Sequence, residues 1–502
     1  MNIVWLKKDL RLSDHAPLYH AIADGRPFAL VFCFEPSISQ TPSFDVRHWW
    51  FMYNALEEMN AALYPFNLPV HIFHNEVIAV FSAIHGNAPD KDNNNGIEVI
   101  FSHQETGIAA TYTRDKQMAQ FCKDNGIIWR EYADNGIVRG LKSLEGWGKM
   151  WGSAMKQPLF NVNLRQAKSA VPDKQWLQTE KRISTLPPEI KQTAPPFLPD
   201  WAYQKFGEQQ AQQLLLSFIE TRSRQYLTQL HQAEPTLHSS SRLSAYLTYG
   251  NISARQIFQT LRRYPSNRNL SAFKSRLIKR FQYIQQFEME ERIEFENLNF
   301  AFNGIRIKND PNHYEAWAAG QTGYPLVDAA MRCVRSTGYL SFDLRAYLVS
   351  FLTHHLWLDW RKGGANYLAR QFMDFEPGLH YTQIQIQAGC TGFHPIHISN
   401  LVKQSREQDP QAIFIKQWLP ELSRVPPELC HTPWQMSDLE QQWYQCKPGK
   451  DYPKPIIDHE RTQIFAYNEL TRVKNSILGR QEAARLRDRY MLDHRTKTNK
   501  DE

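Results

Sequence analysis

Short apolar runs alternate with longer helix-like stretches along the first 135 residues. The apolar runs are rich in Val, Ile and Phe and span residues 4–6, 28–34, 70–73, 99–102 and 127–130. Between them, residues 47–64 and 111–125 carry apolar side chains at the three- and four-residue spacing of an amphipathic helix. Strands that alternate with helices are typical of βαβ units. We therefore predict that residues 1–135 form an α/β domain around a parallel, five-stranded, doubly wound sheet.

The pattern changes after residue 205. Apolar residues now recur three and four positions apart, as in Leu344, Leu348 and Phe351, and β-branched alternation almost disappears, which favours a large all-α domain. Residues 136–204 show weak periodicity and five prolines between residues 187 and 199, a composition typical of an extended connection. The predicted divisions are an α/β domain at 1–135, a linker at 136–204, a helical domain at 205–480 and a basic tail at 481–502.

Composition excludes several classes of protein. The 502 residues are 42% hydrophobic and 22% charged, which is unlike disordered, collagen-like or disulfide-rich chains. No apolar run reaches the roughly 18 residues of a membrane helix, and the start of the chain becomes charged too early for a signal peptide. We expect a cytoplasmic protein without a membrane partner. None of the six cysteines stands in a Cys-x-x-Cys pair, so no metal site is predicted.

The net charge of +7 is unevenly placed. Between residues 472 and 500, nine Lys and Arg residues are opposed by three acidic residues. A solvated helix with a frayed end explains this cluster, and so does a segment that follows nucleic-acid phosphates. Charge alone does not choose between them.

Common nucleotide and hydrolase motifs are absent, because the chain has no Gly-x-Gly-x-x-Gly after its first strand, no P-loop and no Gly-x-Ser-x-Gly. Three other groups of residues stand out. Residues 239–244 place serines and Arg242 before a helix, where they could cradle phosphate or simply cap the helix. Residues 317–332 contain a turn set by Gly and Pro before a helix, a pattern that is typical of an ordinary loop-to-helix junction. Arg345, Trp360 and Asp374 could form a structural ion pair or hold a polar heterocycle.

Five separated motifs, in this order, resemble those of the photolyase/cryptochrome superfamily. They are Trp5–Arg11, Ser240–Ser244, Thr322–Pro325, Leu358–Arg361 and Phe414–Leu422. The resemblance extends to about Ala466 and implies a light-driven flavoprotein with a helical domain that binds a U-shaped FAD. It also implies an α/β domain that can hold an antenna pigment, a folate or a deazaflavin. Residues 103–105 do not distinguish the two pigments. UV-damaged DNA is the implied partner, and a monomer is expected.

The resemblance assigns the cofactor positions one by one. The matches to the FAD phosphate and ribose contacts are Tyr226, Ser240, Ser241, Arg242, Leu243 and Ser244. Arg280 matches a residue near the same pyrophosphate. Arg345 and Asp374 match the ion pair beside the isoalloxazine ring, and Glu376 takes the place of an acid that faces the ring.

The substrate side departs from the dimer-repairing members. Arg276 and Lys279 replace a Glu and a Trp, and the usual Trp-Met-His-Asn-Arg turn reads Tyr-Leu-Ser-Phe-Asp at residues 339–343. Gln385 and Gln387 replace two tryptophans, one that stacks on the lesion and one that starts an electron-hopping chain. The expected DNA contacts are Arg276, Lys279, Tyr283, Lys403 and Gln404, and the electron-transfer candidates are Trp360, Tyr381 and Trp357. The His pair of (6-4) photoproduct repair is absent at Ser341 and its neighbours.

Two functions follow from the resemblance. The first is a deoxyribodipyrimidine photolyase, a carbon–carbon lyase that splits cyclobutane pyrimidine dimers by electron transfer from photoexcited reduced FAD. The basic substitutions and the short C-terminal extension favour this function. The second is a cryptochrome-like blue-light receptor that binds FAD and signals through a partner, which the altered pocket favours. A DNA-binding module without a cofactor does not explain the FAD residues. We predict the photolyase, with the receptor as the alternative.

Overall fold

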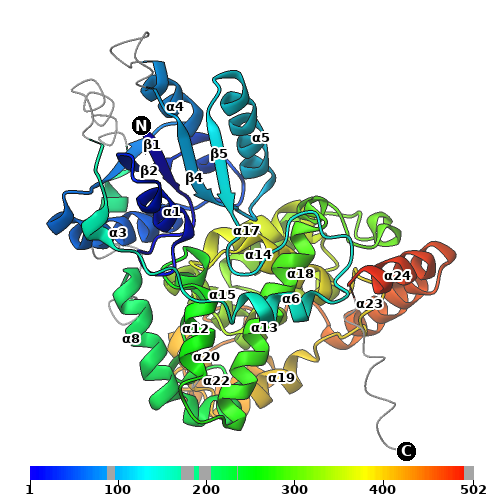
Figure 1. Cartoon of the computed structure of the whole chain (residues 1–502). Helices are drawn as coiled ribbons and strands as arrows, with labels where there is room; N and C mark the ends of the chain where they lie inside the picture. The colour runs from blue at the N-terminus through cyan, green and yellow to red at the C-terminus, as the bar shows by residue number, and fades with distance from the viewer. Residues whose placement is uncertain (87–95, 171–185, 192–204, 235, 491–502) are drawn as a thin grey trace, which may run out of the picture.

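The computed structural model describes residues 1–86, 96–170, 186–191, 205–234 and 236–490 (Figure 1). An α/β part at the N-terminus, drawn in blue and cyan, lies against a larger helical part, drawn mostly from green to red. Much of the predicted linker and the end of the predicted basic tail, from residue 491 onward, lie outside the described residues.

The α/β part is built on one sheet. Its strands are β1 (Asn2–Leu6), β2 (Phe28–Phe34), β3 (Val70–His74), β4 (Val99–His103) and β5 (Ile128–Tyr132). They lie in the order β3-β2-β1-β4-β5, and every neighbouring pair is parallel. All residues of the central β1 are buried, as expected for a strand with a neighbour on each side and helices on both faces. The predicted parallel five-stranded sheet is confirmed.

Helices cover both faces of the sheet. They are α1 (Ala16–Asp24), α2 (Pro36–Ser39), α3 (Val46–Leu63), α4 (Val77–Gly86) and α5 (Ala109–Asp124). Because alternate side chains of a strand point to opposite faces, Val4 and Leu6 join one hydrophobic cluster and Ile3 and Trp5 join the other. The sheet is therefore doubly wound, as predicted.

The second part of the described chain is predominantly helical. Its longer helices are α8 (Gly207–Glu220), α12 (Ala254–Leu261), α13 (Arg268–Glu288), α14 (Pro311–Ala319), α15 (Pro325–Thr337), α16 (Phe342–Ser350), α17 (Ala365–Gln371), α18 (Pro377–Gln387), α19 (Leu401–Gln408), α23 (His459–Lys474) and α24 (Ile477–Tyr490). Shorter ones are α9 (Tyr226–Gln229), α10 (Thr236–Ser239), α11 (Ser244–Thr248), α20 (Ile413–Trp418), α21 (Pro427–Cys430) and α22 (Asp438–Trp443). The predicted boundary at residue 480 falls within α24.

A helix that the sequence pattern did not predict lies in the first half of the predicted linker. This helix, α6 (Trp147–Ala154), buries Trp147 and Trp151 completely. The Trp151 ring stacks on Phe281 of α13 at a centroid distance of 5.9 Å. Two tryptophans one turn apart share a helix face, but three glycines and the short length hide the helical period. This segment is therefore part of the helical core rather than a free connection.

The motif at Thr322–Pro325 has a structural role. Asp328 is fully buried and accepts hydrogen bonds from the Thr322 and Gly323 backbone N–H groups at 2.7 and 3.0 Å and from the Tyr452 hydroxyl at 2.5 Å. Gly323 has a φ of +78°, and a Cβ there would lie 2.4 Å from the Lys454 carbonyl carbon. Only glycine fits this close crossing of two backbones. These contacts support a loop-to-helix junction at this motif.

The motif at Trp5–Arg11 joins the two parts of the chain. The Leu10 N–H donates to the Tyr249 carbonyl at 3.1 Å, and the Asn251 amide donates to the Leu10 carbonyl at 2.7 Å. The fully buried Arg11 donates to the Gly250 carbonyl at 3.1 Å and pairs with Asp134 at 2.9 Å. Backbone hydrogen bonds between the parts fix their relative position without help from any ligand.

A second contact between the parts uses acidic side chains from the end of α13 and the turn after it. Glu288 accepts hydrogen bonds from the Thr106 hydroxyl at 2.5 Å and the Tyr112 hydroxyl at 2.7 Å. Glu294 accepts from the Ala109 N–H at the start of α5 at 2.8 Å. Burial raises the pKa of Glu294 to about 7, although that hydrogen bond opposes the shift.

This raised pKa predicts a pH dependence of stability. The folded protein holds the Glu294 proton up to about pH 7, whereas the unfolded chain releases it near the ordinary pKa of 4.5. The free energy of unfolding should therefore fall as pH rises from about 4.5 to about 7, by roughly 2–3 kcal/mol from this group. Urea denaturation across this range tests it. Glu294→Gln should remove that decrease, and an unchanged pH profile in this variant would contradict the assignment.

Within the described ranges, no helix is long and apolar enough to cross a membrane. The six cysteines are all buried and free, and burial raises the pKa of Cys33, Cys122 and Cys333. They are packing residues here.

Candidate cofactor site

An ion pair lies at the centre of the helical part. Arg345 of α16 donates from Nη2 to Oδ2 of Asp374, which precedes α18, at 2.9 Å. Its Nε donates to the Leu340 carbonyl at 3.0 Å, and the guanidinium lies 4.1 Å from the centre of the Phe372 ring. Burial alone would raise the pKa of Asp374, but the Arg345 charge and hydrogen bond lower the pKa below its usual value. Asp374 therefore carries a fixed negative charge in this pocket.

Arg280 of α13 extends this arrangement. Its Nη2 donates to the Thr248 hydroxyl at 2.9 Å, and that hydroxyl donates to the Asp374 carbonyl at 3.3 Å. The Glu376 carboxylate is 3.9 Å from Arg280. Burial lowers the pKa of Arg280 and raises that of Glu376. The buried Nε of Arg280 has no hydrogen-bond partner among the described residues, so this cation is only partly compensated by protein groups.

The serine segment before α11 is held by residues that sequence reasoning missed. The Arg222 guanidinium donates to the Ser240 carbonyl and, at 3.3 Å, to the Ser241 carbonyl. The Ser240 hydroxyl lies 3.1 Å from the Tyr339 hydroxyl, and the Arg242 guanidinium lies 3.9 Å from the centre of the Tyr339 ring. Arg242 itself has a φ of +58°. Nothing in the spacing of Arg222 and Tyr339 along the chain indicates that they meet here.

Tyr226, Leu243 and Ser244 complete the predicted set. Tyr226 is buried edge-on against the Phe218 ring, and burial raises the pKa of its hydroxyl to about 12. Leu243 is buried, and Ser244 begins α11 and lines a cavity together with Arg242 and Asp374. Tyr226 and Leu243 pack in the hydrophobic core of the helical part and do not line this cavity.

These groups fit an anionic cofactor with a heterocyclic ring. The buried Ser239 hydroxyl and Arg280 Nε lack partners within the part of the chain that the structure describes, and both can donate to phosphate oxygens. Arg345 and Asp374 offer one cation and one anion to a ring that has both donors and acceptors. Arg280 and Glu376 lie beside Asp374, and Arg242 and Ser244 line one cavity with Asp374, so these predicted residues lie close together.

A small cavity adjoins the ion pair. Apolar side chains such as Leu368, Phe372 and Ile384 form most of its wall, and Gln387 lies at its edge. Gln385, two residues away on α18, is buried elsewhere: its amide donates to the Ile293 and Glu296 carbonyls at 3.0 and 2.8 Å and accepts from the Leu298 N–H. Gln385 is thus a structural residue.

The electron-transfer candidates are only partly brought together. The rings of Tyr381 and Trp360 are buried with centroids 6.5 Å apart, and Trp360 donates to the Asn297 amide oxygen at 2.8 Å. Trp357, with a φ of +53°, instead packs edge-on against Phe465 at 5.1 Å. No ring contact between Trp357 and Trp360 occurs in the described structure.

The predicted DNA contacts lie on two helices. On α13, Lys279 is exposed with its Nζ 4.9 Å from the centre of the Tyr283 ring, and Arg276 is half-buried. On α19, the exposed Lys403 is 3.9 Å from the Glu407 carboxylate, and the half-buried Gln404 lines an open cavity.

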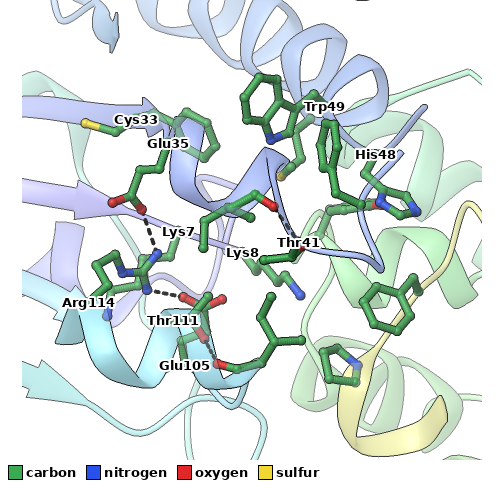
Figure 2. Close-up of a pocket in the computed structure, with 18 of the residues that line it drawn as sticks. Lys7, Lys8, Cys33, Glu35, Thr41, His48, Trp49, Glu105, Thr111 and Arg114 are labelled. Atoms are coloured by element: carbon green, nitrogen blue, oxygen red, sulfur yellow. Dashed lines mark hydrogen bonds and ion pairs between the residues drawn. The ribbon is translucent and has the colours of Figure 1, made fainter. Parts of the chain in front are cut away.

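A further cavity lies where the ends of β1 and β2 meet α3 (Figure 2). Trp49 and His48 project from α3, and Lys8 lies near the cavity centre. Arg114 of α5 is paired with Glu35 at 2.9 Å and Glu105 at 2.6 Å. Glu105 also lines an adjoining polar cavity, together with His103 and Gln104. Residues 103–105, which did not distinguish a folate from a deazaflavin in the sequence analysis, all line this polar cavity.

Asp9, His15 and His103 form a buried cluster whose ligand-type atoms lie within 4.8 Å of one another. The His15 Nδ1 accepts a hydrogen bond from the Leu18 N–H at 3.1 Å and caps α1. A neutral His15 must therefore carry its proton on Nε2, which lies 3.1 Å from Asp9 and cannot also bind a metal. Burial lowers the pKa of His15, so this ring is neutral. The cluster is best explained as a hydrogen-bonded junction.

Two family models match this chain. The model described as DNA photolyase matches residues 2–143, which make up the α/β part. The model described as the FAD binding domain of DNA photolyase matches residues 273–472, which contain Arg280, Arg345 and Asp374. Together they cover both parts of the fold.

Similar proteins carry two kinds of name. A deoxyribodipyrimidine photo-lyase from Alkalihalophilus pseudofirmus is 26% identical over 92% of this chain and 96% of its own length. A cryptochrome DASH from Synechocystis sp. is 26% identical over 92% of this chain and 96% of its own length. The crystal structure of a bacterial class III photolyase from Agrobacterium tumefaciens has the same fold, with a TM-score of 0.81 at 23% identity, covering 94% of this chain and 98% of that one. The chain therefore belongs to the photolyase/cryptochrome superfamily and contains its FAD-binding domain.

Proposed function

We propose that this protein is a deoxyribodipyrimidine photolyase that splits cyclobutane pyrimidine dimers in UV-damaged DNA. The observation that carries the proposal is the Arg345–Asp374 pair, which adjoins a cavity that shares Phe342, Ala346 and Gln387 with a second, open cavity. When bound, FAD supplies the light-excited electron donor of this reaction. The protein then has to hold FAD, admit a flipped dinucleotide and exclude water between them.

The cofactor roles follow from the contacts. Arg280 and the serine segment would hold the diphosphate, because each offers a buried donor without a partner among the described residues. Arg345 and Asp374 would hold the ring. Glu376, whose pKa is raised by burial, would face the ring as a carboxyl that keeps its proton more readily than a solvent-exposed one.

DNA would approach along α13 and α19. Lys279 and Arg276 on α13 and Lys403 on α19 provide positive charge for phosphates, and Tyr283 beside Lys279 provides an aromatic surface. Gln404 lies between this charge and the open cavity. Binding of undamaged DNA is then electrostatic and weakly dependent on sequence.

The cavity of Figure 2 would hold the antenna pigment. Trp49 and Phe44 give it a largely aromatic wall, and Arg114 is already neutralised by Glu35 and Glu105, which leaves Lys8 as the cation at its centre. Such a wall suits a flat conjugated ring. Residues 103–105 lie at the border with the adjoining polar cavity, so the choice between folate and deazaflavin stays open.

One assay tests the proposed reaction. Chemically reduced, FAD-loaded protein is mixed with an oligonucleotide that contains a single thymine dimer, and restored thymine is measured after blue light and in the dark. We expect repair only in the light. Protein that binds FAD but neither repairs nor prefers the dimer would overturn the proposal and support the blue-light receptor instead. The specific observation behind that alternative is Asp343, an acid at the mouth of the open cavity where dimer-repairing relatives carry a base.

We further propose that Trp360 and Tyr381 relay one electron toward the cofactor pocket. Trp360→Phe keeps an aromatic ring but removes an easily oxidised donor, so photoreduction of oxidised flavin with an added thiol should slow sharply. The variant leaves the buried Asn297 amide oxygen without its donor, which should cost about 1–3 kcal/mol of stability. Repair by chemically reduced protein should persist, since the relay is not needed there. Photoreduction at the wild-type rate would show that Trp360 serves only in packing.

A further inference from the structure

The open cavity is lined by glutamine amides that the protein does not use. Gln387 at the end of α18 and Gln404 and Gln408 on α19 all line it. None of the three side chains makes a hydrogen bond to the residues that the structure describes, and the amide oxygen of Gln408 is buried without a partner. Buried amides are normally satisfied, so an unpaired one needs an explanation.

The neighbouring Gln385 shows what a structural glutamine does in this fold. Its donors and acceptor are all used by carbonyl and N–H groups of residues 293–298. Gln387, two residues further along α18, lines both the small cavity beside Arg345 and the open cavity. The side chain of Gln385 is therefore structural, whereas the amide of Gln387 makes no hydrogen bond to the described residues.

The two carboxylates that line this cavity each have a partner within the protein. Asp343 is paired with His231 at 2.5 Å, and Glu407 lies 3.9 Å from Lys403. A ligand in this cavity therefore meets paired carboxylates and neutral amides. This favours a neutral group with mixed donors and acceptors over a second phosphate.

The pyrimidine edge has this pattern. In thymine, a ring N–H lies between two carbonyl oxygens, so each base presents one donor and two acceptors. An amide side chain offers both a donor and an acceptor and can pair with this edge in two hydrogen bonds. Enzymes that flip a base recognise it through such contacts to its Watson–Crick edge.

We propose that Gln387, Gln404 and Gln408 determine specificity by hydrogen bonding to the pyrimidine edges of the flipped dinucleotide. This proposal rests on the proposed function and names its recognition residues. Phosphate contacts on α13 supply general DNA affinity, and the amides supply preference for the lesion.

The test compares dark binding of two oligonucleotides of equal sequence, one with a thymine dimer and one undamaged, by fluorescence anisotropy on FAD-loaded protein. Gln387→Met, Gln404→Met and Gln408→Met keep side-chain volume but remove the amide. Each should reduce the preference for the dimer about five- to tenfold, the worth of one or two neutral hydrogen bonds. Affinity for undamaged DNA should not change in Gln387→Met and Gln408→Met. Gln442→Met, an exposed glutamine of α22, is the matched control.

Two negative results are distinguishable. If the wild-type protein shows no preference for the dimer, both this proposal and the proposed function fail. If the wild-type protein prefers the dimer and the three variants keep that preference in full, the amides are not the recognition residues, and the proposed function stands. FAD absorption and melting temperature are recorded for every variant. Gln404 does not line the cavity beside Arg345, so Gln404→Met keeps the test informative if Gln387→Met releases FAD.

Discussion

Arg345→Ala should abolish stable FAD binding. The variant leaves the Asp374 carboxylate ionised and without its cation in a site where the side chain is only 5% exposed. Removing one partner of a buried ion pair costs on the order of 3–5 kcal/mol. FAD would have to bind against this unpaired charge and without the Arg345 donor. A loss of that size corresponds to at least a hundredfold weaker binding.

A second pair provides a matched control. Arg361 and Asp359 are joined at 2.6 Å with side-chain exposures of 23% and 6%, close to the 19% and 5% of Arg345 and Asp374. Arg361 lies outside the cavities that line the cofactor site. Arg361→Ala should therefore lower the melting temperature by a similar amount but keep its FAD. Flavin absorption after gel filtration measures the difference. A full complement of FAD in Arg345→Ala would contradict the assigned role of this pair.

The fold was predictable because its main signals are local. Every residue of β1 after Asn2 is apolar, and so is every residue of β2. Each strand is therefore visible as a short apolar run without any knowledge of its partners. The change of period after residue 205 is equally local. Helix α6 was missed because its signal, two buried tryptophans one turn apart, becomes clear only once Phe281 is seen to receive Trp151.

The cofactor site was predictable only through resemblance. Arg345 and Asp374 are 29 residues apart, and no spacing rule joins them. Arg222 and Tyr339, which hold the serine segment, match no motif and emerge only from the contacts of folded chain segments. Gln385 and Gln387 are the same residue type two positions apart on α18, but they face different surroundings. Gln385 is structural, while Gln387 lines a cavity.

The sequence also did not distinguish a repair enzyme from a signalling receptor, for a related reason. Relatives at 26% identity include both photolyases and a cryptochrome DASH, so the shared fold and FAD-binding domain do not decide the activity. The decisive residues are those that face the open cavity. Asp343 and Gln387, two positions at which the resemblance implies a departure from dimer-repairing members, both line this cavity. Measurements on the cavity residues, rather than on the five motifs that carry the resemblance, therefore separate the two functions.

Gly250→Ala should disrupt the joint between the two parts of the protein. Gly250 has a φ of +71°, and a Cβ there would lie 2.3 Å from the Lys8 carbonyl oxygen and 2.5 Å from the Asp9 Cα. Both obstacles are backbone atoms that cannot rotate away. The flanking hydrogen bonds of Leu10 with Tyr249 and Asn251 would have to lengthen to make room. We expect a loss of about 3 kcal/mol or more, from the left-handed backbone and the overlap together.

Gly140→Ala isolates the backbone contribution. Gly140 has nearly the same φ, +73°, but no atom within 4 Å of the added Cβ. This control should lose only about 1–2 kcal/mol, the cost of an L-residue in the left-handed region. The difference between the two variants in urea denaturation is then the cost of separating the α/β part from the helical part. Because Lys8 lines the cavity of Figure 2, Gly250→Ala should also perturb any pigment bound there. Equal stability losses in the two variants would mean that residues 8–11 and 249–251 move apart without loss of stability. Other contacts would then hold the two parts together.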